Sequence, residues 1–192
     1  MNEENIKIAN IKKSCHIGKI ISNIMCVMAI VGCVCCAVAG IMIFATKAET
    51  EPQIVALTDE GRFDTERFNV GYVDLGDPED WHSDIPALQN IMDEYPYSFS
   101  LSTYILMMAG LLAVTAVLTK LISKTFETIE KEDTPFTDKV IKKVMIVMIF
   151  GSALLFLTTG MAQGVLGGLV TWAVYNILDY GKTLQVQSDE TL

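Results

Sequence analysis

The chain has 192 residues, of which 51% are hydrophobic and 19% are charged, and its net charge is −9. So apolar a balance in a short chain is typical of integral membrane proteins. The net acidity is confined to residues 46–98, which hold 13 acidic and 3 basic residues. No segment has the basic face or stripe that proteins use against nucleic acid phosphates, so we expect no direct nucleic acid binding.

The first long apolar run is residues 20–46, which contain no charged side chain. A bilayer core about 30 Å thick is crossed by about 20 apolar residues in a helix, whose backbone satisfies its own hydrogen bonds there. Ala37-Val38-Ala39 has the form of a signal-peptidase site, but apolar sequence continues past it. We therefore expect a retained transmembrane span over residues 20–45.

Lysines near the spans predict which side of the membrane each connection occupies. Residues 1–19 contain four lysines, and residues 120–143 contain six. Basic residues close to a span mark the cytoplasmic side. Residues 1–19, which would suit a short interfacial helix, and the loop 120–141 are therefore predicted to be cytoplasmic, and the acidic residues 46–98 to be extracytoplasmic.

The acidic insert predicts a small mixed structure. Residues 53–58 and 68–73 are short apolar runs typical of strands, and residues 86–95 predict a helix capped by Ser83 or Asp84. Its densest acidic tract would suit a weak Ca²⁺ site, although the spacing does not match an EF-hand loop, and a solvated loop is the ordinary interpretation. The candidate ligands are Asp74, Asp77, Glu79, Asp80 and Asp84.

Three further spans are predicted after the insert. Residues 99–119 form the second span, and the 35 uncharged residues 144–178 are long enough for two more, over 142–160 and 163–180. The glycine-rich residues 159–164 predict the break between them. A re-entrant hairpin is the alternative for this region. Residues 181–192, the C-terminal segment, then return to the cytoplasm, with Gly181 as the residue that ends the last helix.

Small residues at helical spacing predict the edges where these helices pack closely. The same edges would also suit a homo-oligomer. The five cysteines all lie between positions 15 and 36, and we interpret them as small packing residues rather than as metal ligands. The predicted packing residues are Gly32, Cys36, Gly40, Ala109, Ala113, Gly164 and Gly168.

The cytoplasmic loop contains a well-marked helix start. Thr137 is predicted to be the N-cap, with Asp138 at the positive end of the helix dipole. Phe136 and Ile141 then occupy the two positions of a hydrophobic staple. The fold expected from all these features is an all-α polytopic membrane protein, a four-transmembrane-helix bundle with a small α+β extracytoplasmic insert.

Two segments resemble a bacterial family. The loop from Phe126 through Lys131 to Thr134-Pro135-Phe136-Thr137, and the ending from Tyr180-Gly181 through Leu184-Gln185 to Asp189-Glu190-Thr191-Leu192, are similar to the four-helix membrane proteins of domain-of-unknown-function family 2975. That family has no established activity. The resemblance implies a multi-pass protein of the bacterial cytoplasmic membrane, often paired with a small helix-turn-helix regulator. The contact residues it implies are Pro135, Phe136, Thr137, Gly181, Leu184, Asp189 and Glu190.

Three classes of function can be compared on the residues. A regulatory or sensory protein that contacts a cytoplasmic regulator fits the resemblance, although Pro135-Phe136-Thr137 is equally explained as a helix start. Transport as an independent activity is disfavoured, because the spans hold no ionisable residue for a substrate path. The alternative is therefore an accessory subunit of a transporter or of an envelope assembly. No nucleophile–base pair or phosphate-binding glycine loop predicts an enzyme, and no cofactor is expected.

Overall fold

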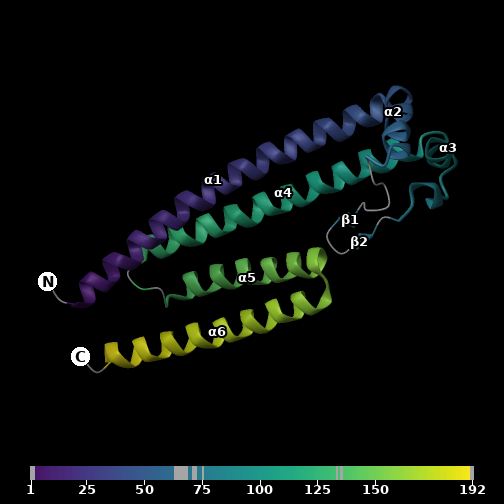
Figure 1. The fold of residues 1–192 in the computed structure, drawn as a ribbon. Coiled ribbons are helices and arrows are strands. Elements are labelled where there is room, and N and C mark those ends of the chain that lie inside the picture. Colours follow the sequence, from purple (N-terminus) through teal and green to yellow (C-terminus); the bar gives the residue numbers. More distant parts are fainter. Residues whose placement is uncertain are drawn as a thin grey trace. The chain divides into compact units, whose positions relative to one another are not determined.

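The computed structural model describes residues 3–62, 69–70, 73–74, 76–132, 134 and 136–190, with only the backbone for 3–8, 69–70, 73–74, 79 and 188–190. The chain divides into two compact units, one of residues 1–28 with 115–192 and the other of residues 29–114. Figure 1 shows the helices: α1 (Glu3–Ala45), α2 (Lys47–Asp59), α3 (Pro86–Glu94), α4 (Pro96–Lys131), α5 (Asp138–Thr159) and α6 (Met161–Glu190).

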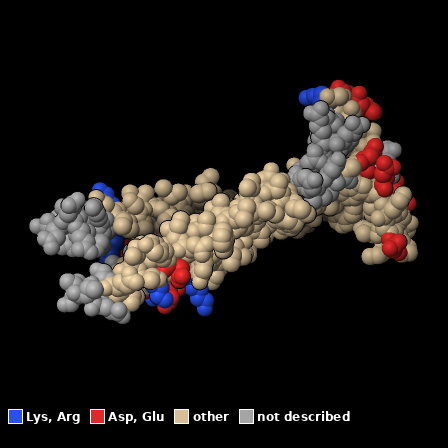
Figure 2. All heavy atoms as spheres, turned by 90° about the horizontal axis from the view of Figure 1, so that it is seen from below, with Lys and Arg blue, Asp and Glu red and all other residues tan. Residues whose placement is uncertain are grey.

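Four of these helices are long and apolar enough to cross a membrane, which confirms the four predicted apolar helices. Their apolar parts fall within Ala9–Ala45, Pro96–Lys131, Asp138–Thr159 and Met161–Gln187. Large apolar side chains such as Met28, Leu157 and Ile177 are about two-thirds exposed. Lipid tails, unlike water, are a favourable surrounding for such surfaces. In Figure 2 the uncharged surface runs along the helices, and the coloured charged side chains lie near helix ends.

Two helices continue beyond the expected limits of their spans. α1 is a single helix from Glu3 onward, so residues 3–19 do not form a separate interfacial helix. α6 runs through Gly181 to Glu190, so Gly181 is not the residue that ends it. At about 1.5 Å per residue, the 30 residues of α6 extend over about 45 Å, more than a bilayer core requires.

The break between α5 and α6 lies at Gly160, inside the segment predicted for it. Gly160 has φ of 103°, a conformation that favours glycine, and follows directly on Thr159 at the end of α5. α6 begins at the next residue, and the two helices lie side by side (Figure 1). The uncharged residues 144–178 are therefore divided between two antiparallel helices, which are connected by the single residue Gly160.

In the first unit, the N-terminal part of α1 packs against the C-terminal part of α4 through polar contacts. The Cys26 thiol lies 3.4 Å from the carbonyl oxygen of Ala116, and the Ser123 hydroxyl donates to Oδ1 of Asn23 at 3.0 Å. Glu130 accepts a hydrogen bond from Lys19 at 3.2 Å. These contacts satisfy the polar groups on the facing sides of two largely apolar helices.

In the second unit, small residues on α1 bring it close to α4. A Cβ placed on Gly40 would lie 2.8 Å from Cγ of Leu106, and one on Gly32 would lie 3.3 Å from a methyl group of Leu112. Ala109 is 5% exposed. Ala113, which was also expected on this packing edge, is exposed instead. Four residues from Ala109 is slightly more than one turn, and here that difference turns Ala113 away from the contact.

The α+β insert is not supported. Residues 53–58, predicted as a strand, lie in helix α2, where Ile54 is 5% exposed. Alanine, glutamate, lysine and glutamine around this short apolar run favour a helix, and a run of six residues does not distinguish the two states. In place of the strand predicted over 68–73, β1 (Asn69–Val70) and β2 (Val73–Asp74) pair antiparallel, followed by the 3₁₀ turn η2 (Pro78–Asp80).

The predicted short helix is present as α3, but its cap differs. Ile85 is the N-cap residue, and it provides no side-chain hydrogen bond. The Ser83 hydroxyl accepts from the Ile85 N–H at 3.2 Å, while Gln89 Oε1 accepts from the Ser83 N–H at 2.7 Å. The side-chain bonds thus stabilise the approach to the helix rather than its first turn.

Candidate functional site

The loop between α4 and α5 begins the next helix as its residues predicted. Thr137 has an extended backbone, and its hydroxyl accepts from the N–H of Val140 at 3.4 Å. Asp138 lies in the first turn, where its charge is favoured by the helix dipole. Val140 and Ile141 are buried, so the first turn of α5 is packed within the first unit. Thr137 therefore acts as a helix cap.

The same loop packs against the part of α6 that extends beyond the uncharged residues 144–178. The ring of Phe136 lies on Gly181, where a Cβ would come within 2.7 Å of Cδ1 of that ring. The absence of a side chain at Gly181 is what admits the ring. Glycine in a helix is usually unfavourable, so this close contact is a physical reason for its presence.

Two side-chain bonds flank the aromatic contact. Thr134 donates to Oε1 of Gln185 at 2.9 Å, and Lys182 donates to Oδ1 of Asp138 at 2.6 Å. Thr134 also accepts from the N–H of Phe136 at 3.2 Å, which holds the turn. We call these contacts between residues 134–138 and residues 181–185 the loop–helix junction. It brings together the two segments on which the family resemblance rests.

The predicted contact residues fall into three groups in this arrangement. Phe136, Thr137 and Gly181 are used inside the junction or as a cap, while Leu184 is 47% exposed beside it. Pro135 and the side chains of Asp189 and Glu190 lie outside what the structure describes. Lys182 and Gln185 were not predicted as junction residues, because their local sequence does not indicate partners 44 and 51 positions away.

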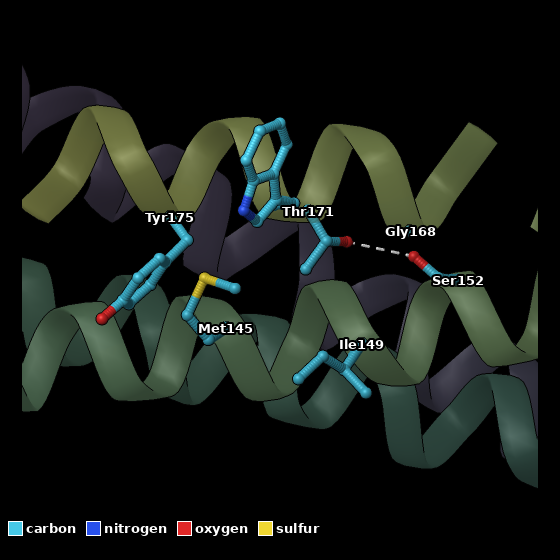
Figure 3. A pocket seen from close by; sticks show the side chains of 7 residues that line it. Met145, Ile149, Ser152, Gly168, Thr171 and Tyr175 are labelled. Carbon is cyan, nitrogen blue, oxygen red and sulfur yellow. Dashed lines mark hydrogen bonds between the residues drawn. The ribbon is translucent and has the colours of Figure 1, made fainter. Parts of the chain in front are cut away.

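A second feature of the α5–α6 pair is an open, apolar pocket of about 360 Å³ (Figure 3). Ser152 and Thr171 are hydrogen bonded across it at 3.1 Å. Gly168 was expected to be a close-packing residue, yet a Cβ there would have nothing within 4 Å. Gly167 is the residue against Ser152, and Gly164 lies against Phe156. The pocket is lined by Met145, Ile149, Ser152, Gly168, Thr171, Trp172 and Tyr175.

The acidic tract proposed for Ca²⁺ forms no ligand cluster within the described residues. There, no three acidic, histidine or cysteine side chains lie close enough to hold an ion. Asp77, Asp80 and Asp84 are described and exposed, and the side chains of Asp74 and Glu79 lie outside the described part. The cysteines are free thiols.

Comparison with known proteins returned no match: no family model, no curated protein and no solved structure matches this chain.

Proposed function

We propose that this chain is a non-enzymatic membrane protein that presents the extension of α6 to a small cytoplasmic regulator of the helix-turn-helix class. Its place would be the bacterial cytoplasmic membrane, with both ends of the chain inside. The observation that supports this proposal is the loop–helix junction. It holds one side of the extension and leaves Leu184, on another side, 47% exposed.

The exposed side of the extension has the pattern of a helix that docks in a groove. Tyr180 and Leu184 are spaced at i and i+4, and they are 65% and 47% exposed. Helix-in-groove recognition uses anchors at this spacing. Because the junction already orders the helix, a partner would not have to supply that ordering free energy on binding.

The charge of this segment also suits such a partner. Residues 179–192 contain three acidic residues and one lysine. DNA-binding proteins carry a basic surface, and an acidic helix would attract it when it is not occupied by DNA. A membrane protein that binds this surface would hold the regulator away from DNA.

The test is co-purification of the tagged full-length protein from its native membrane, with mass spectrometry of the associated proteins. Leu184→Glu places a charge in the proposed contact. Val186→Glu is the matched control, because Val186 is 48% exposed and lies about 200° further around the helix. We expect a small DNA-binding protein with the wild type and with Val186→Glu, and its loss with Leu184→Glu.

Two outcomes would contradict the proposal. The first is equal recovery of the regulator with both variants, which would place its contact elsewhere. The second is recovery of transporter or envelope subunits that Leu184→Glu does not disturb, which would favour an accessory subunit. Both variants should retain the thermal unfolding temperature of the wild type, since neither residue is buried.

A further inference from the structure

A separate cavity of about 340 Å³ lies between the C-terminal part of α4 and the start of α5. Its lining is polar and basic. Four of its six lining residues are lysines, and one is an acid. The lining residues are Lys124, Glu127, Thr128, Lys131, Lys139 and Lys143.

The described acidic side chains nearby neutralise only part of this lining. Lys131 pairs with Glu127 at 2.6 Å, and Lys139 pairs with Glu132 at 2.8 Å. Lys143 donates to the Thr128 hydroxyl at 2.5 Å, which is a neutral partner. Among the described residues no acid forms an ion pair with Lys124. Among the described residues, the four lysines of the lining therefore face the carboxylates of Glu127 and Glu132, which leaves two positive charges in excess.

Glu130, the remaining acid on this part of α4, is engaged elsewhere. Its two carboxylate oxygens accept from His16 at 3.0 Å and from Lys19 at 3.2 Å, both on α1. Those contacts direct the Glu130 carboxylate toward α1, while its charge still acts on Lys131 of the lining. Because lysines outnumber acids among the described residues at the cavity, an anion from outside the chain would complement it.

The uncharged runs of α4 and α5 would place this cavity at the level of the lipid phosphates. The uncharged run on α4 ends at Thr119, and that on α5 begins at Val144. Lys124 lies about 8 Å beyond the first run and Lys143 about 2 Å before the second, at 1.5 Å per residue. The headgroup layer is several ångströms deep, and flexible lysine stems reach within it.

We propose that this cavity binds a phosphate group, presented either by an anionic phospholipid headgroup or by a soluble phosphate. Lysine ammonium groups are compact charges with three donors each, and they bind phosphate oxygens as point charges. Basic pockets between helices at a membrane surface hold anionic headgroups in this way. Lys124 and Lys143 provide the charge that is not already paired. This site is independent of the proposed regulator contact on α6.

The experiment uses the purified full-length protein in detergent and counts bound lipid by native mass spectrometry. The probes are phosphatidylglycerol, phosphatidylcholine and inorganic phosphate. The variants are Lys124→Gln and Lys124→Gln with Lys143→Gln. The matched control is Lys142→Gln, which removes an exposed lysine of α5 that does not line the cavity.

We expect the wild type and Lys142→Gln to retain phosphatidylglycerol over phosphatidylcholine. Each lining lysine removed should weaken retention by about fivefold. Displacement of phosphatidylglycerol by millimolar inorganic phosphate, but not by chloride of equal ionic strength, would identify a soluble phosphate as the preferred source. Retention despite phosphate would identify the lipid headgroup.

Equal binding by Lys124→Gln and the wild type would overturn the proposal, as would an equal loss with Lys142→Gln. Lys124 is exposed and makes no ion pair with a described residue, so this single variant should fold. It keeps the test decisive even if removal of Lys143, which bonds to the buried Thr128, destabilises the protein.

Discussion

The carboxylate of Glu51 on α2 accepts a hydrogen bond from the main-chain N–H of Ser98 at 2.7 Å, and Ser98 is completely buried. Its other oxygen accepts from the N–H of Tyr97 at 3.0 Å. The first N–H groups of a helix have no partner within it, and a negative charge there also complements the helix dipole. Glu51 thus caps α4 from another helix.

Replacement of Glu51 by alanine should leave these N–H groups without an acceptor. We expect Glu51→Ala to lower the free energy of unfolding by about 1–2 kcal/mol and Glu51→Gln to lower it less, since the amide retains one acceptor oxygen. Glu49→Ala is the control, because Glu49 is exposed on the same helix. Thermal unfolding of the purified protein in detergent measures all three, and equal effects of Glu49→Ala and Glu51→Ala would contradict the capping role.

The close approach of α1 and α4 at Gly40 predicts a second stability difference. Gly40→Ala should force apart the contact with Leu106 and weaken the 2.8 Å bond from the Ser102 hydroxyl to the Gly40 carbonyl. The expected loss is about 1–3 kcal/mol. Gly110→Ala is the matched control, because a Cβ there would meet nothing within 4 Å. If both alanines are tolerated alike in urea or thermal unfolding, Gly40 is not a packing contact.

The loop–helix junction predicts a local effect of substitution at Gly181. Gly181→Leu should displace the Phe136 ring and increase hydrogen exchange over residues 134–138 and 181–187, because the two flanking bonds depend on the same approach. Gly168→Leu, on the same helix, should leave this exchange unchanged, since it projects into the apolar pocket. Unchanged exchange in Gly181→Leu would show that the junction does not order these segments.

The lysine distribution predicts that residues 46–98 and residues 181–192 lie on opposite sides of the membrane. Reporter tags inserted after Glu79 and after Leu192 should therefore give opposite signals in whole cells. If both tags report the same side, the chain crosses the membrane an even number of times between Glu79 and Leu192.

The same predicted topology would place the Gly160 connection on the side of residues 46–98. Met161→Cys, in a background without the native cysteines, should react with an impermeant thiol reagent applied to that side, since Met161 is 69% exposed. A re-entrant hairpin would leave this residue unlabelled from there. Leu155→Cys, within the apolar part of α5, should stay unlabelled in either case.

The sequence by itself determined the features that depend on near neighbours. Four long apolar helices follow from runs without charge, since a charged side chain is costly within lipid. The Thr137 cap and the break at Gly160 follow from residues within one turn of each other. These are local interactions, so they can be read along the chain.

Only the tertiary structure decided which distant residues meet. Glu51 caps a helix 46 positions later, and Phe136 lies on Gly181, 45 positions later. Residues 53–58 are helical because their surroundings favour that state, although the apolar run alone suits a strand. Gly167, rather than Gly168, faces α5, since one residue turns a side chain by about 100°. Helix rotation and long-range pairing are set by packing, which no local pattern encodes.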